Sequence, residues 1–166
     1  MKQIAIAGGW RKTDSQVEND VRKIVREIIS GGDGIISGGA LGVDYIATDE
    51  ALRTGCNKNQ LKIFIPSTLE IFHDHYFKKA NEGVITQEQA RVLILQLKEV
   101  KKKGCLVEGK DTILNKETYF KRITKIIENA DELIAFHINQ SEGTQDTINK
   151  ANKKGIPVKV FTYLIN

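Results

Sequence analysis

The feature of this sequence that most restricts its fold is a short apolar segment that ends in glycines. The segment reads Ile35-Ile36-Ser37-Gly38-Gly39-Ala40-Leu41-Gly42-Val43-Asp44, and small or apolar residues then recur at helical spacing. This order indicates a buried strand, a glycine turn and the start of a helix. Glycine lets backbone N–H groups approach a ligand and a helix N-terminus attracts anions, so the turn is typical of phosphate binding. The same glycines would also suit a tight turn that binds nothing.

Strands and helices alternate along most of the chain. Apolar runs of strand length occupy residues 4–7, 35–37, 61–65, 132–136 and 157–161, with helical apolar stripes between most of them. Strands joined by helices run parallel, with right-handed crossovers. The sequence therefore predicts an α/β fold: a three-layer, doubly wound, mainly parallel sheet of the Rossmann-like type, with strand order about 3-2-1-4-5.

Residues from about 67 to 116 interrupt the alternation. The segment is too long for an ordinary connection and contains a capping box at Thr86 to Gln89, followed by an apolar stripe through Leu93 and Leu97. We expect an ordered helical insertion within a single Rossmann-like nucleotide-binding domain of residues 1–166. The insertion would be a lid over the site or a dimer face, so a homo-oligomer is compatible with the sequence.

Composition restricts the class of protein. Of the 166 residues, 40% are hydrophobic and 28% charged, which is ordinary for a globular protein. There is no apolar signal region at the start and no run long enough for a membrane span, so we expect a cytoplasmic protein without a membrane partner. The formal net charge of +4 suits a polyanionic partner but does not require one. Two cysteines are too few for a disulfide framework.

Three loops share the anion-binding character of the glycine turn. Each follows a predicted strand, and parallel strands place their carboxyl ends at one edge of a sheet. We therefore predict one site for a nucleotide or a nucleotide-derived phosphate, in a protein that acts as a sensor or carrier. The residues predicted to bind the ligand from these loops are Gly8, Gly9, Trp10, Arg11, Ser37, Gly38, Gly39, Ala40, Leu41, Gly42, Asp44, Ser141, Glu142, Gly143 and Thr144.

Side chains in these loops suggest individual roles. Ser141 and Thr144 offer hydroxyls beside a helix N-terminus, which together would clamp a phosphate. Arg11 could pair with a phosphate and Trp10 could stack on a base, although both are equally ordinary loop residues. Asp44 either reads a ribose hydroxyl or stabilises the dipole of its own helix.

Other candidate chemistries lack support in the sequence. His73 and His75 lie too close in sequence to share a helix face, and no third ligand completes a metal site, so we expect no metal. His137 has no nucleophile beside it. The strict dinucleotide fingerprint is also absent after the first strand, so we expect no required cofactor.

The glycine turn resembles the motif of the SMF/DprA and LOG proteins, which belong to the SLOG superfamily of Rossmann-like domains. Asp131–Phe136, Ser141–Thr144 and Gly155–Val158 are similar to the closing half of the same pattern. The likeness covers roughly residues 3–66 and 118–161. It implies a nucleotide or nucleotide-derived ligand at the sheet edge or, in the DNA-processing branch, the backbone of single-stranded DNA.

The chain departs from both branches at identifiable positions. The DNA-processing branch usually has Arg where this chain has Leu41, and an Arg-Asn pair where it has Arg122 and Ile123. The match of Arg122 adds that residue to the predicted ligand-binding set. The LOG phosphoribohydrolases have Glu where this chain has Thr147.

These departures leave three hypotheses. The first is a nucleotide-type small-molecule binder that acts as sensor or carrier. The second is an enzyme that cleaves or transfers an N-glycosidic bond of a nucleotide, with Glu142 or Asp146 as the carboxylate. The third is a single-stranded DNA-binding module of the DprA type.

Overall fold

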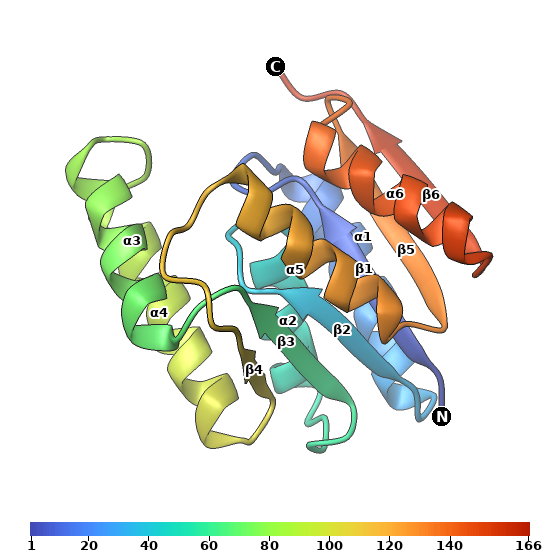
Figure 1. Cartoon of the computed structure of the whole chain (residues 1–166). Helices are drawn as coiled ribbons and strands as arrows, with labels where there is room; N and C mark the ends of the chain where they lie inside the picture. The colour runs from blue at the N-terminus through green and yellow to red at the C-terminus, as the bar shows by residue number, and fades with distance from the viewer.

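The chain forms one six-stranded sheet with helices on both faces (Figure 1). The structure is a computed structural model that describes residues 1–166. In chain order, its elements are β1 (Gln3–Gly8), α1 (Ser15–Ser30), β2 (Gly34–Gly38), α2 (Val43–Arg53), β3 (Leu61–Ile65), α3 (Leu69–Asn81), α4 (Gln87–Lys102), β4 (Leu106–Glu108), α5 (Lys116–Glu128), β5 (Glu132–Ile138), α6 (Glu142–Lys154) and β6 (Val158–Tyr163).

The sheet confirms the predicted α/β class and the relative order of the predicted strands. Its order is β4-β3-β2-β1-β5-β6, and every neighbouring pair is parallel. The fourth and fifth predicted strands correspond to β5 and β6. When β4 is left out, the observed order is therefore the predicted order 3-2-1-4-5. The edge strand β4 was not predicted, because it has three residues and belongs to a segment whose pattern is helical. The chain builds the sheet outward from β1 through β2, β3 and β4, and then returns to add β5 and β6 on the other side of β1. The strand order therefore reverses between β1 and β5, as in doubly wound folds.

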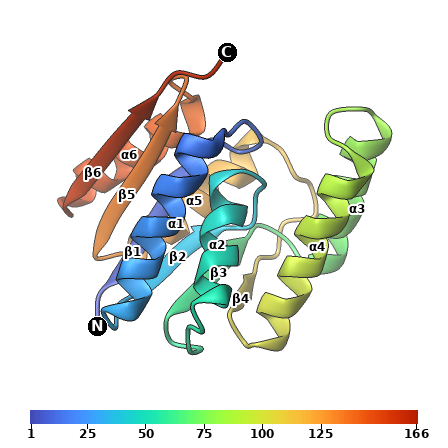
Figure 2. The ribbon, with the colours of Figure 1, turned by 180° about the vertical axis from the view of Figure 1, so that it is seen from behind.

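Two apolar clusters hold helices to the two faces of the sheet. The larger joins the sheet to α1, α2, α3 and α4, and the smaller joins it to α5 and α6. Figure 1 shows α5 and α6 in front of the sheet, and Figure 2 shows α1 and α2 on the opposite face. None of the helices is both long and apolar enough to span a membrane.

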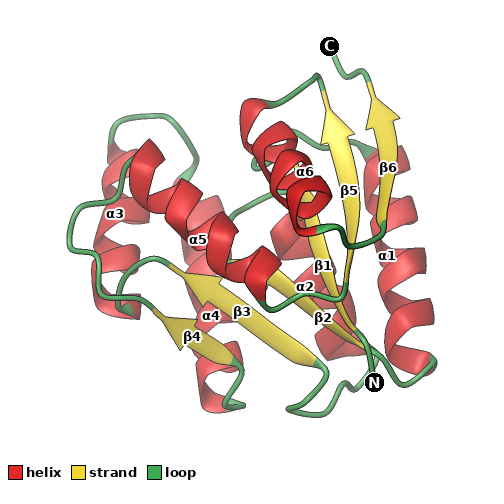
Figure 3. Cartoon of the chain, turned by 45° about the vertical axis from the view of Figure 1, so that its right-hand side comes forward, coloured by secondary structure: helices red, strands yellow, loops and turns green.

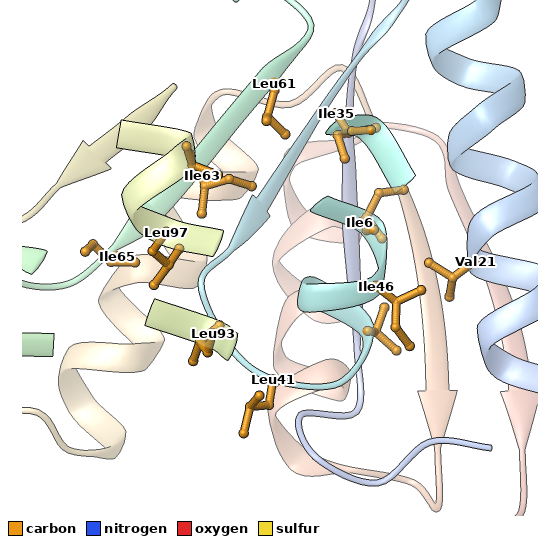
Figure 4. Close-up of a cluster of buried hydrophobic side chains, with 14 of the residues drawn as sticks. Ile6, Val21, Ile35, Leu41, Ile46, Leu61, Ile63, Ile65, Leu93 and Leu97 are labelled. Carbon is orange, nitrogen blue, oxygen red and sulfur yellow. The ribbon is translucent and has the colours of Figure 1, made fainter. Parts of the chain in front are cut away.

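The segment between β3 and β4 folds into two helices that pack on each other. The capping box predicted at Thr86 and Gln89 starts α4, with the Gln89 amide N–H donating to Thr86 Oγ1 over 3.0 Å. Leu93 and Leu97 of α4 are buried in the larger cluster, where Leu97 lies beside Ile65 and Leu93 near Leu41 (Figure 4). The apolar face of α4 is thus covered by this chain's own core.

The strands end together at one edge, which gathers their loops. Gly8 of β1 is in register with Phe136 of β5, and Gly38 of β2 is in register with Phe64 of β3. The arrowheads in Figure 3 point to this shared edge. Two of the loops are also joined directly, by a bridge between Trp10 and Gly42 and by a hydrogen bond from Val43 N–H to the Gly9 carbonyl.

Candidate functional site

A cavity of about 390 Å³ opens at the carboxyl ends of β1 and β2. The two strands and their loops form its floor, while α3, α5 and the N-terminus of α6 form its walls. Its lining residues are Ile6, Ala7, Gly8, Trp10, Gly38, Ala40, Asp44, His75, Tyr76, Lys79, Leu114, Asn115, Lys116, Tyr119, Phe120, Arg122, Ile123, Ile126, Ser141, Gly143, Thr144 and Thr147. The volume lies in the range of small-molecule sites in proteins.

All three predicted loops contribute to this cavity. Residues 8 and 10 come from the loop after β1, residues 38, 40 and 44 come from the glycine turn and the start of α2, and residues 141, 143 and 144 come from the loop after β5. Arg122 reaches the same cavity from α5. The convergence follows from the parallel sheet, because its strand ends share one edge.

The other predicted residues lie outside the cavity wall. Gly39 and Leu41 pack into the core, and Gly42 faces the Gly9 carbonyl, so this part of the glycine turn is scaffold. Ser37 is buried, and its hydroxyl donates to the Ile6 carbonyl. Three further predicted binding residues lie outside the wall: Gly9 packs on Ile138, Arg11 donates to the Val84 carbonyl over 3.1 Å, and Glu142 pairs with Lys116.

The two candidate catalytic carboxylates are not among the residues that line the cavity. Glu142 is exposed and pairs with Lys116 over 2.5 Å. Asp146 pairs with Lys150 on the next turn of α6. Neither carboxylate lines the cavity, where Asp44 supplies the one acidic side chain.

Arg122 is the cation closest to the strand ends. Its guanidinium carbon lies 2.7 Å from the position that a Cβ on Gly38 would occupy, so only glycine permits this approach. The guanidinium carbon also lies over the Tyr119 ring, 5.1 Å from its centroid. Nε and Nη1 of Arg122 are both buried and have no hydrogen-bond partner. The arginine is therefore held in place by packing, with its donors free.

Asp44 faces Arg122 from the first turn of α2. Its Oδ1 lies within hydrogen-bond distance of the Ser37 Oγ, at 2.9 Å, and the Ala40 N–H donates to its Oδ2 over 3.3 Å. The carboxylate and the guanidinium form no ion pair within 4 Å. Burial raises the pKa of Asp44, while the charge of Arg122 and the two hydrogen bonds oppose the shift.

The sequence predicts a helical insertion that is either a lid over the site or a dimer face, but it does not predict which residues of α3 line the cavity. His75, Tyr76 and Lys79 line the cavity from this helix, which lies within the segment that the family resemblance leaves unmatched. Burial and the neighbouring lysines lower the pKa of His75, so its ring is neutral at pH 7. The i, i+4 spacing of His75 and Lys79 indicates that both lie on one face of a helix. The sequence does not indicate that this face lies against the edge of the sheet.

The unpartnered polar atoms of the molecule all lie on this one cavity. Four buried side-chain nitrogen or oxygen atoms have no hydrogen-bond partner: Arg122 Nε and Nη1, His75 Nε2 and Tyr119 Oη. The Tyr119 ring lies between the other two groups, with its centroid 6.4 Å from that of His75. Buried polar groups in folded proteins nearly always have partners, so such a cluster indicates a place where a ligand or water completes the bonds.

The first turn of α6 adds a second anion-binding element. Ser141 occupies the N-cap position, but its hydroxyl donates to Thr144 Oγ1 over 2.8 Å and caps no backbone N–H. Open space surrounds the position that a Cβ on Gly143 would take. The N–H groups of this turn are therefore available to an anion in the cavity.

Trp10 forms the rim of the cavity. Its side chain is among the exposed large apolar groups, with 37% of the residue accessible to solvent. The Arg11 guanidinium carbon and the Lys79 Nζ lie 4.9 Å and 5.6 Å from the ring centroid. It is the only tryptophan of the chain. No group of three or more His, Cys, Asp or Glu side chains is placed to hold a metal ion.

Comparison of the sequence with protein families finds a match over nearly the whole chain. The family model described as DNA recombination-mediator protein A matches residues 1–165. A search of curated proteins found no significant match.

Comparison with solved structures finds a similar fold in two DNA processing proteins. DNA processing protein A from Helicobacter pylori, described as binding single-stranded DNA, has a TM-score of 0.71 and 23% identity over 96% of this chain and 64% of that one. DNA processing protein A from Streptococcus pneumoniae has a TM-score of 0.53 and 16% identity over 95% of this chain and 58% of that one. This chain therefore spans less than two thirds of either protein.

A carrier protein has the same fold. The molybdenum cofactor carrier protein from Chlamydomonas reinhardtii has a TM-score of 0.59 and 13% identity over 100% of this chain and 91% of that one. Identities this low show a shared fold only. Together the family match and these folds confirm the predicted resemblance to the SLOG superfamily.

Proposed function

We propose that the cavity of this chain, which belongs to the DNA recombination-mediator protein A family, binds a nucleotide through its phosphate. The protein would act as a sensor or carrier of that nucleotide. One observation carries the proposal: the three residues whose buried side-chain polar atoms have no hydrogen-bond partner all line this cavity. Leaving a buried donor unpaired costs about 1–3 kcal/mol, and more when the donor is charged. A ligand with several acceptor oxygens would remove that cost.

Electrostatics supports an anionic ligand. Arg122, Lys79 and Lys116 line the cavity, whereas Asp44 is its only carboxyl group. Lys116 is paired with Glu142, which leaves Arg122 and Lys79 without acidic partners within 4 Å. The free N–H groups of α6 add partial positive charge at the same edge. A phosphate fits these donors better than a neutral ligand does.

The remaining parts of a nucleotide have candidate partners as well. The exposed Trp10 ring at the rim is suited to stack on a base. Asp44 lines the cavity as a hydrogen-bond acceptor that could receive a sugar hydroxyl. We assign these contacts as part of the proposal.

A titration with purified protein tests this function. Fluorescence of Trp10 and isothermal titration calorimetry would follow binding of nucleoside monophosphates, ADP-ribose, cyclic nucleotides and the matching nucleosides. Gly143→Asp would add a carboxylate in open space at the N-terminus of α6, so we expect it to weaken binding at least ~10-fold through repulsion. Gly143→Ala, in the same open space without the charge, should bind like the unaltered protein. The absence of binding to every phosphate-bearing compound would refute the proposal.

Single-stranded DNA is a second candidate ligand. The family and the description of the Helicobacter pylori protein favour it, and so does the rim, where Trp10 is flanked by Arg11 and Lys79. An aromatic ring with nearby cations is a common element of single-strand sites. If the chain binds a strand, gel-shift affinity should fall steeply with added salt, because phosphate contacts release counterions. The absence of any shift at low salt would exclude this candidate.

A further inference from the structure

We infer that the cavity takes a terminal phosphate monoester, on a free mononucleotide or at the end of a strand, in preference to an internal phosphodiester. The inference rests on the proposed function, because it concerns the phosphate that the cavity would hold. Three features of the wall carry it: the direction from which Arg122 can be reached, the number of free donors and the balance of charge.

The surroundings of Arg122 restrict how a phosphate can reach it. Its guanidinium carbon lies 2.7 Å from the position of a Cβ on Gly38 and 5.1 Å from the centroid of the Tyr119 ring, and its Nε and Nη1 are buried. A phosphate bound there must carry its substituents away through the open side of the cavity. A monoester has one such substituent, whereas an internal diester has two sugars that would have to leave through the same opening. The cavity of about 390 Å³ has room for one nucleotide rather than for a continuing strand in both directions.

The free donors exceed what a diester can use. Arg122 makes no protein hydrogen bond, although a guanidinium has five N–H donors. The buried Tyr119 hydroxyl next to it is also unpartnered, and Lys79 adds an ammonium group with no acidic partner within 4 Å. An internal diester offers two non-bridging oxygens, whereas a monoester offers three terminal oxygens. The monoester therefore satisfies more of this wall.

The charge of the wall also fits a dianion. A phosphate monoester carries about −1.5 to −2 at pH 7, compared with −1 for a diester. Arg122 and Lys79 supply two positive charges, and the ring of His75 is neutral. Asp44 opposes an anion only while it is ionised, and burial already favours its neutral form. A bound dianion would favour that form further and leave both cations to balance the phosphate.

Binding of matched oligonucleotides tests the inference. The first set of ligands is an eight-nucleotide thymidine strand with hydroxyl ends and the same strand with a 5′-phosphate or a 3′-phosphate. A longer hydroxyl-ended strand of equal total charge controls for the added charge. The second set is free thymidine 5′-monophosphate, with thymidine as its control. At fixed salt, we expect at least one phosphorylated strand or the mononucleotide to bind about 10-fold more tightly than its hydroxyl-ended control, the gain of one charged hydrogen bond. Tighter binding of a phosphorylated strand would identify a strand end as the source of the phosphate, and tighter binding of the mononucleotide would identify a free nucleotide.

Substitutions at two positions on different helices complete the test. Arg122→Gln should abolish the preference for the phosphorylated ligands, and Arg122→Lys should reduce it, because lysine keeps the charge but loses the planar fork. Arg91→Gln removes an exposed arginine that pairs with Glu88 on α4 outside the cavity, and it should leave the preference unchanged. Equal binding of phosphorylated and hydroxyl-ended ligands would overturn the inference while the proposed function stands. No binding of any ligand would overturn both. The ligand comparison on the unaltered protein is decisive even if a variant at Arg122 does not fold.

Discussion

Replacing Gly42 with alanine should destabilise the fold more than replacing any glycine in open space. Gly42 has a φ of +77° and caps the start of α2. A Cβ built on it would lie 2.3 Å from the Gly9 carbonyl oxygen and 2.8 Å from the carbonyl carbon of Trp10. Both neighbours are backbone atoms, which cannot rotate away as the end of a side chain could. The two loops that meet at the Trp10–Gly42 bridge would have to separate.

The expected loss comes from two sources. Backbone strain at a glycine-only conformation costs about 1–3 kcal/mol. Forcing an extra carbon into packed backbone costs about 1–3 kcal/mol more. At about 2–4 °C per kcal/mol for a chain of this length, the melting temperature should fall by roughly 5–20 °C. Because the bridge positions Trp10 at the cavity rim, nucleotide binding should weaken as well.

Urea unfolding followed by far-ultraviolet circular dichroism measures this loss, with two control variants. Gly83→Ala has a similar φ of +78° and nothing within 4 Å of its Cβ, so it should show the strain alone, about 1–2 kcal/mol. Gly143→Ala has neither a positive φ nor a close neighbour and should be nearly neutral. If Gly42→Ala is no less stable than Gly83→Ala, the argument from close backbone approach is wrong.

Three further substitutions test other parts of the structure. The folded-state pKa of Asp44 is raised above its ordinary value of 3.8, so its contribution to stability is fully present below that value and is lost as pH rises through the folded pKa. Urea unfolding should be measured at a series of pH values from below 3.8 upward. As pH rises, the free energy of unfolding should fall more steeply for the unaltered protein than for Asp44→Asn, and parallel plots against pH would contradict the shift. Lys154 Nζ donates to the carbonyls of Ile127, Glu128 and Ala130 at the end of α5, so Lys154→Met should cost about 1 kcal/mol in urea unfolding, against no change for exposed Lys153→Met. Thr86→Ala removes the cap of α4 and should cost about 1 kcal/mol by the same assay, and an unchanged midpoint would show that the capping box contributes nothing.

The sequence by itself determined the class of fold and the edge where the site lies. Apolar runs separated by helical stripes predict a parallel sheet, because local hydrophobic period reports which residues are buried in a strand or helix. The predicted strand order holds for all the strands that were predicted. The convergence of the three loops also follows from topology alone, so the sequence predicts one site for Gly8, Trp10, Asp44 and Ser141, and all four line the same cavity.

Only the tertiary structure decided which predicted residues face the cavity. Gly39 and Leu41 belong to the same glycine turn as Gly38 and Ala40, yet they point into the core. Whether a residue of an irregular turn points into the core or into the cavity depends on its φ and ψ angles and on the packing of neighbouring elements. The residue type alone does not encode either. The strand β4 was missed for a related reason, since its three residues are held by pairing with β3 rather than by a pattern of their own.

The wall contributed by α3 and α5 was also a tertiary result. His75 and Tyr119 are separated by a helix, a strand and three loops, yet their ring centroids lie 6.4 Å apart in the folded chain. No local period or motif joins residues so distant in sequence. The free donors that define the candidate ligand therefore become visible only when hydrogen-bond partners can be assigned in three dimensions.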